Sequence, residues 1–169
     1  MKAFRMAGPG EAGVVEVPDA VVGAGEALLR VKMVGMCGTD LNTFRGRNGM
    51  VTFPRVPGHE VAAEVVEGGG ELAAGTAVTV SPYTNCGTCA SCRRGRVNAC
   101  QFNETMGVQR DGAMTEYISV SQEKLYAAKL SIKELCLVEP LTVGFHAAAR
   151  GRVTAEDTVA VFGCGGVGL

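Results

Sequence analysis

Four cysteines within fifteen residues constrain this chain more than any other feature of its sequence. Cys86, Cys89, Cys92 and Cys100 follow the spacing Cys-x2-Cys-x2-Cys-x7-Cys. Four thiolates this close together can surround one tetrahedral ion, and zinc held by four cysteines forms closed structural sites. We therefore expect a small lobe that folds around a structural zinc ion.

An iron–sulfur cluster and two disulfides are the other interpretations of this spacing. Similar spacings occur in ferredoxins, and an electron carrier of that kind would be coloured when purified. The chain has seven cysteines, an odd number that does not suit a fully paired disulfide framework. Its first residues, Met1 to Arg5, also lack the continuous apolar segment of a signal peptide. Zinc remains the favoured interpretation.

The charge balance excludes several classes of partner. Sixteen Lys and Arg against seventeen Asp and Glu give a net charge of −1, which offers no basic surface for nucleic acid and no polybasic membrane patch. Charged residues, Gly or Pro interrupt every apolar stretch before it reaches membrane-spanning length. We expect a soluble cytoplasmic protein whose partner is a small molecule.

Short β-like runs separated by glycine turns fill most of the chain, in which 24 of 169 residues are Gly. Alternating polar and apolar residues predict a half-buried strand from Leu28 to Val34. Similar runs cover Glu60–Glu67, Ala77–Val80 and Met114–Val120. Several short strands with irregular turns point to an antiparallel barrel or sandwich.

The pattern changes after about residue 130. Ser131 to Glu134 forms a capping box that predicts a short helix, and Pro140 can begin a second helix that runs to about Arg150. A short apolar strand, Val159–Phe162, then leads into a glycine turn that a helix should follow. The sequence stops one residue after Gly168, so we expect a shortened chain or a piece of a longer one.

A second group of residues suits an open catalytic zinc site. Cys37, Thr39 and Asp40 precede His59 and Glu60, and a thiolate, an imidazole and a carboxylate are ligands that such sites use. Asp40 could accept the second imidazole proton of His59, and Thr39 could pass a proton between a bound alcohol and solvent. Taken singly, Cys37 could be a small buried hydrophobe and His59 a core histidine. Their combination favours the metal site.

Glu139 has two interpretations that the sequence leaves open. It follows the apolar run Leu135–Val138 and precedes Pro140. If it is buried, its carboxylate must be paired or bound. If it is exposed, it is an ordinary acid in the first turn of a helix, where the helix dipole favours it.

The order and spacing of all these motifs resemble the zinc-dependent medium-chain dehydrogenase family over essentially the whole chain. The stretch from Glu139 to His146, EPLTVGFH, is similar to sorbitol dehydrogenase at the domain crossover and places the resemblance in the polyol, sugar-acid and threonine dehydrogenase branch. The resemblance implies a mainly β fold with short helices. A GroES-like β-barrel catalytic domain would cover residues 1–150, and the first strand and glycine turn of a truncated Rossmann α/β domain would cover residues 151–169.

The family also implies roles for individual residues. Cys37, His59 and a carboxylate would hold the catalytic zinc, with Glu60 and Glu139 both near the metal and either one its direct ligand. Thr39 matches the proton-relay hydroxyl of the family. The four-cysteine motif would hold a structural zinc. The pyrophosphate of NAD or NADP would lie against a GxGxxG turn, whose glycines are Gly163, Gly165, Gly166 and Gly168.

The implied activity is oxidation of a secondary alcohol of a polyol, sugar or sugar acid by hydride transfer to a nicotinamide. Asn42 stands where threonine dehydrogenases carry a relay histidine, which disfavours threonine as the substrate. Family members are longer and pair through their cofactor domains, so we expect a homo-oligomeric parent protein and an inactive chain on its own. The alternative is a non-catalytic, zinc-stabilised GroES-like interaction module, which would need only the four-cysteine lobe.

Overall fold

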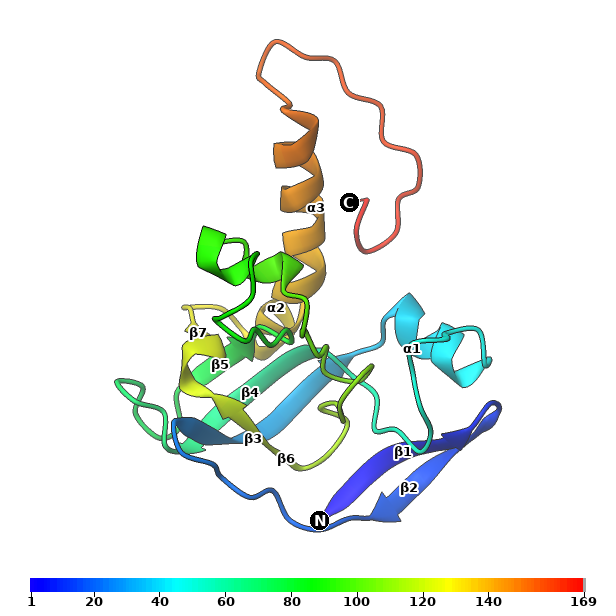
Figure 1. The fold of residues 1–169 in the computed structure, drawn as a ribbon, viewed down its shortest axis with the longest axis vertical. Coiled ribbons are helices and arrows are strands. Elements are labelled where there is room, and N and C mark those ends of the chain that lie inside the picture. The colour runs from blue at the N-terminus through cyan, green and yellow to red at the C-terminus, as the bar shows by residue number, and fades with distance from the viewer. Residues whose placement is uncertain (169) are drawn as a thin grey trace.

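Two antiparallel sheets and a projecting helix make up the chain in a computed structural model that describes residues 1–168 (Figure 1). The first sheet pairs β1 (Lys2–Gly8) with β2 (Glu11–Glu16). The second sheet has the strand order β6-β3-β4-β5-β7. Its strands are β3 (Glu26–Gly35), β4 (Glu60–Glu67), β5 (Ala77–Val80), β6 (Tyr117–Ser121) and β7 (Leu125–Ala127).

Three α-helices among residues 1–168 accompany the larger sheet. α1 (Gly38–Phe44) follows β3 directly, whereas α2 (Ile132–Cys136) and α3 (Val138–Gly151) follow the last strand. α3 begins against the sheet and then projects away from it (Figure 1). Three single-turn helices, η1 (Cys92–Arg94), η2 (Val97–Ala99) and η3 (Gln122–Lys124), complete the regular structure. No helix among residues 1–168 has the length and apolar character needed to cross a bilayer.

Strand β4 separates two apolar clusters because successive side chains of a strand point to opposite faces. Val61, Ala63 and Val65 pack into the main core, on one face of the larger sheet. Ala62, between them, faces the other way and packs against Leu135 of α2. The short helix α2 is thereby fixed to the back of the sheet, which positions the start of α3.

Leu135 is fully buried, so truncating it should leave a cavity under α2. We expect Leu135→Ala to lower the free energy of unfolding by about 2–5 kcal/mol, as buried leucines generally do. Leu137, two residues later, is 60% exposed, and Leu137→Ala should change the same quantity by less than about 0.5 kcal/mol. Urea unfolding of the two variants checks this, and equal losses would contradict the packing described here.

The predicted elements are largely confirmed. β4 and β5 have the predicted bounds, and β3 contains the predicted strand. Ser131 caps α2 as its capping box predicts: the Glu134 N–H donates to the Ser131 hydroxyl, and the Glu134 carboxylate accepts from the Ser131 N–H. α3 begins at Val138, so Pro140 lies in its first turn, where a missing N–H costs nothing.

Two predicted strands differ from the structure. The run predicted from Met114 to Val120 becomes a strand only at Tyr117, because Met114 instead bonds the backbones of Phe4 and Pro57. The strand predicted at Val159–Phe162 is wrong for this structure: the segment is irregular and exposed. A strand needs a neighbour to satisfy its backbone groups, and no strand of residues 1–168 pairs with this segment.

Candidate functional site

Residues 1–168 contain two groups of side chains that could each hold a metal ion. The first group is the four cysteines, and the second is Cys37, His59 and Glu60. Within each group, the potential ligand atoms lie within 4.8 Å of one another. The structure therefore brings together the thiolate, the imidazole and one of the two carboxylates that the sequence suggested, and it shows which carboxylate is nearer.

Backbone turns and N–H donors arrange the four cysteines. The N–H groups of Cys86 and Phe102 donate to the Cys100 Sγ atom at 3.4 and 3.3 Å, and the Cys89 N–H donates to the Cys86 Sγ atom at 3.3 Å. Gly87 and Gly95 have φ values of 72° and 71°, which favour glycine and allow the chain to reverse twice. These turns and hydrogen bonds direct the sulfurs inward from within one short segment of the chain.

The protonation behaviour of these thiols suits metal binding. The Thr88 hydroxyl and neighbouring N–H groups lower the pKa of Cys86 to about 6, so its thiolate forms readily. Burial raises the pKa of Cys92 to about 12. A buried thiol of this kind loses its proton at neutral pH only when a cation offsets the cost, as a coordinated metal does. The donor set and its surroundings therefore fit zinc.

The three-residue cluster forms where two segments of the chain meet. Cys37 directly precedes α1, His59 directly precedes β4, and Glu60 is the first residue of that strand. Gly58 has φ +99°, and a Cβ atom there would lie 2.7 Å from Val34 Cγ1, so only glycine fits before the histidine. His59 is 6% exposed, and its Nδ1 atom is buried without a hydrogen-bond partner among the described residues. An orphaned imidazole beside a thiol and a carboxylate fits a zinc site.

Asp40 joins the two segments that carry the ligands. Its Oδ2 atom accepts the Cys37 N–H at 3.0 Å, and its Oδ1 atom accepts the Gly58 N–H at 3.2 Å. The Oδ1 atom lies 3.9 Å from His59 Nδ1, which is longer than a hydrogen bond. Asp40 is therefore close to the His59 imidazole but does not form the predicted hydrogen bond with it. Its hydrogen bonds to two backbone N–H groups are a role that the sequence did not reveal.

We expect Asp40→Asn to weaken zinc binding at the three-residue cluster by about 10- to 100-fold, the range typical for residues that orient metal ligands. The amide keeps one acceptor oxygen, so one of the two backbone N–H groups loses its partner. Zinc affinity measured by chelator competition checks this. Asp157→Asn is the control, because Asp157 also accepts a backbone N–H but lies exposed after α3. Equal zinc affinities of the two variants would contradict the role of Asp40 in holding the two ligand-bearing segments together.

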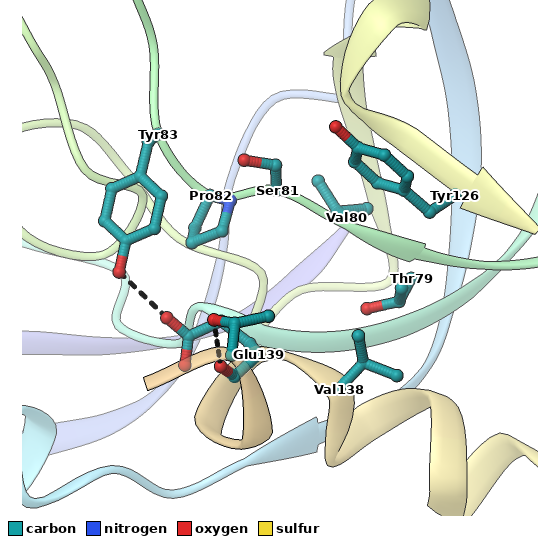
Figure 2. A pocket seen from close by; sticks show the side chains of 9 residues that line it. Thr79, Val80, Ser81, Pro82, Tyr83, Tyr126, Val138 and Glu139 are labelled. Atoms are coloured by element: carbon teal, nitrogen blue, oxygen red, sulfur yellow. Dashed lines mark hydrogen bonds between the residues drawn. The ribbon is translucent and has the colours of Figure 1, made fainter. Parts of the chain in front are cut away.

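Glu139 is buried, which decides between the two interpretations that the sequence left open. Its side chain lies in the first turn of α3 and is 7% exposed. The Tyr83 hydroxyl donates to its Oε1 atom at 2.9 Å, at one side of a cavity of about 280 Å³ (Figure 2). Although Tyr83 is 41% exposed, partial desolvation and this hydrogen bond raise the pKa of Tyr83 to about 12.

The Glu139 charge also acts on the metal-ligand cluster. Burial is the first cause that raises the pKa of Glu60, the neighbouring His59 lowers it, and the negative charges of Glu139 and Asp40 raise it by smaller amounts. Tyr83 is the one residue of this arrangement that sequence reasoning missed. It follows Pro82 after β5, and no motif in that segment signals a partner 56 residues away.

Thr39 and the glycines occupy different surroundings. Thr39 lies in the first turn of α1, two residues after Cys37, and is half-buried. The glycine segment lies apart from the metal clusters, beside α3, where it lines a cavity of about 1020 Å³ with Leu141 and Phe145. Gly163 has φ +99°, and the Gly168 N–H donates to the Gly165 carbonyl at 3.1 Å. The turn is formed, but the strand and helix that would make it a pyrophosphate site are not found in residues 1–168.

Comparison with known proteins shows what this arrangement is similar to. Residues 23–130, more than half of the chain, match the alcohol dehydrogenase GroES-like domain. The chain is 38% identical over 180 residues to sorbitol dehydrogenase of Bacillus subtilis, covering 100% of this chain and 50% of that protein. It is 36% identical over 158 residues to L-galactonate-5-dehydrogenase of Escherichia coli, covering 91% of this chain and 46% of that protein.

A solved structure agrees with these matches. The E. coli RspB alcohol dehydrogenase, in complex with NADH, superposes with a TM-score of 0.91 at 31% identity, covering 99% of this chain and 50% of that one. The chain thus spans about half the length of the relatives that it matches. The fold is the mainly β, GroES-like architecture with short helices that the resemblance implied. The chain belongs to the zinc-type medium-chain alcohol dehydrogenase family, in its polyol dehydrogenase branch.

Proposed function

We propose that this chain supplies the metal-binding, catalytic part of an NAD- or NADP-dependent dehydrogenase that oxidises a secondary alcohol of a polyol, sugar or sugar acid. The observation that carries the proposal is the convergence of Cys37, His59 and Glu60, with ligand atoms within 4.8 Å of one another. The buried, unpartnered His59 Nδ1 atom supports it. A purely structural module would have no use for this second cluster beside its four-cysteine lobe.

The residues have separable roles in this proposal. Zinc bound at the cluster would lower the pKa of a substrate hydroxyl and so favour loss of its proton at neutral pH. Cys37, His59 and Glu60 hold the ion, and Asp40 fixes the two segments that carry them. The Thr39 hydroxyl takes up the proton of the substrate hydroxyl and passes it to solvent. A bound nicotinamide would supply the acceptor for the hydride and both its electrons, which would leave the substrate carbon as a carbonyl.

In this proposal, the catalytic and cofactor-binding roles fall to the two domains expected from the sequence. Residues 1–150 form the catalytic domain in this proposal, and residues 151–169 begin the dinucleotide-binding domain. Gly163, Gly165, Gly166 and Gly168 then approach the cofactor pyrophosphate only once a strand and a helix flank them. These 169 residues are accordingly inactive by themselves. A robust NAD- or NADP-dependent oxidation rate from this chain alone would contradict that part of the proposal.

The names of the relatives support the substrate class. Both a polyol, sorbitol, and a sugar acid, L-galactonate, occur among them. Arg45 and Arg47 lie exposed in the turn after α1, where they suit a carboxylate as well as solvent. The class of substrate is therefore a polyhydroxylated small molecule, with neutral and acidic members both included.

Zinc content tests the proposal most directly. We expect two zinc ions per chain in protein purified without chelator or added metal, one for each cluster. Cys37→Ser should leave one. A single zinc in the unmodified chain that is lost on Cys89→Ser would favour the non-catalytic module instead.

A further inference from the structure

Gly35 is the last residue of β3 and lies directly opposite Glu60, the first residue of β4. The backbone at this position does not require glycine, because its φ value is not in the left-handed region that other residues avoid. Glycine within a strand weakens the strand, and it often marks a place where another group comes close. The space over Gly35 is therefore the feature that needs an explanation.

The Glu60 side chain fills that space. A Cβ atom at Gly35 would overlap the Glu60 Oε2 atom, and it would lie 2.9 Å from Glu60 Cβ and 3.1 Å from Glu60 Cδ. Cβ atoms of residues directly opposite each other in an antiparallel pair normally lie about 4.5–5.5 Å apart. The Glu60 carboxylate is thus folded over β3, in the place where any other residue would put its own side chain.

This placement brings the carboxylate to the metal-ligand cluster. Cys37 follows Gly35 by two residues, so a carboxylate that lies over Gly35 is next to the segment that carries the thiol. A Glu60 carboxylate oxygen, the Cys37 Sγ atom and a His59 ring nitrogen lie within 4.8 Å of one another. Glu60 therefore reaches the cluster across the strand pair, through the space that Gly35 leaves open.

The backbone of Glu60 is held in place from the other side. The buried Cys136 thiol of α2 donates to the Glu60 carbonyl at 3.3 Å. The neighbouring Leu135 packs against Ala62 of β4, which fixes α2 to the sheet. Because the pairing with β3 and this contact with α2 both hold the Glu60 backbone, its side chain is the part that must move when the space over Gly35 is filled.

We propose that Gly35 is a positioning residue whose missing side chain leaves the space that holds the Glu60 carboxylate beside Cys37 and His59. The third ligand of the cluster then depends on a residue that has no functional group of its own. This inference rests on the proposed function and deepens it.

Gly35→Ala in the full chain tests the inference. We expect it to lower the zinc affinity of the three-residue cluster by about 10- to 100-fold, the range typical for residues that orient metal ligands. The four-cysteine site should keep its zinc affinity, and chelator competition measures both. Gly13→Ala is the matched control, because Gly13 lies in β2 opposite Arg5 and a Cβ atom there meets nothing within 4 Å.

A double variant shows whether Gly35 acts through Glu60. Glu60→Gly removes the carboxylate together with its Cβ atom, so the methyl group added by Gly35→Ala has room in the double variant. The zinc affinity of Gly35→Ala/Glu60→Gly should then equal that of Glu60→Gly to within about twofold, the limit set by ordinary additivity. A general structural effect of Gly35→Ala would instead cost the same affinity with and without the Glu60 side chain.

The outcomes are distinguishable. Equal zinc affinities of Gly35→Ala and Gly13→Ala at the three-residue cluster would overturn the inference and leave the proposed metal site intact. An equal loss from Gly35→Ala with and without the Glu60 side chain would also overturn it. An unmodified chain that binds no zinc at this cluster would overturn the proposed function and this inference together.

Discussion

Cys89→Ser is expected to remove one zinc ion per chain and to unfold the four-cysteine lobe. Structural zinc in small domains binds with an apparent free energy of about 10–16 kcal/mol, and that binding energy is folding energy. The lobe has little else to hold it: its interior consists of the cysteines themselves, and Cys92 and Cys100 are the buried members of the set. Three thiolates and a hydroxyl should not replace four thiolates.

The unfolding should stay local because the two segments that flank the four-cysteine lobe are hydrogen-bonded to each other. The Thr84 N–H donates to the Glu104 carbonyl, and the Met106 N–H donates to the Pro82 carbonyl. Both bonds lie outside the cysteines and pair the two chain segments that enter and leave the lobe. The five-stranded sheet should therefore survive, with an unchanged strand signal in circular dichroism.

Trypsin reports on the lobe directly, since Arg93, Arg94 and Arg96 are exposed beside the buried Cys92. In the zinc-bound chain these peptide bonds are held in short turns, whereas Cys89→Ser should be cut there rapidly. Cys164→Ser is the matched control, because Cys164 is exposed and belongs to neither cluster. A Cys89→Ser chain that keeps two zinc ions and resists trypsin would show that the lobe does not depend on the metal.

Much of this arrangement was predictable because it is local in sequence. The four cysteines lie within one short segment, and the capping box of Ser131 and Glu134 spans a single helical turn. The short β-like runs Glu60–Glu67 and Ala77–Val80 form β4 and β5 with the predicted bounds. In each case, the physical cause acts between residues a few positions apart.

The features that sequence reasoning missed depend on contacts between distant segments. Asp40 braces Cys37 and Gly58, and the second of these contacts spans 18 residues. Tyr83 and Glu139 meet because the start of α3 packs against β5, and Tyr83 follows that strand shortly after its end. Val159–Phe162 shows the converse error, since a short apolar run predicts a strand even where residues 1–168 provide no strand to pair with it.

Cys37→Ser is expected to abolish turnover while leaving the four-cysteine zinc in place. A metal that lowers the pKa of a substrate hydroxyl contributes several kcal/mol to the reaction, so its loss should cost on the order of 10³-fold or more in rate. The fold should not suffer, because Cys37 occupies the N-cap position of α1 and serine is among the best residues there. Loss of activity from this variant would therefore report on the metal and not on the helix.

The measurement needs a complete cofactor site. A suitable chain joins residues 1–168 to the part of E. coli RspB that they do not match, since that protein was solved with NADH and superposes on 99% of this chain. Reduction of NAD or NADP with sorbitol and L-galactonate gives the rate, and zinc content should fall from two ions to one. Undiminished turnover in Cys37→Ser would refute the assignment of Cys37 as a catalytic zinc ligand. Retention of both zinc ions with full loss of activity would instead mean that Cys37 contacts the reacting atoms and is not a zinc ligand.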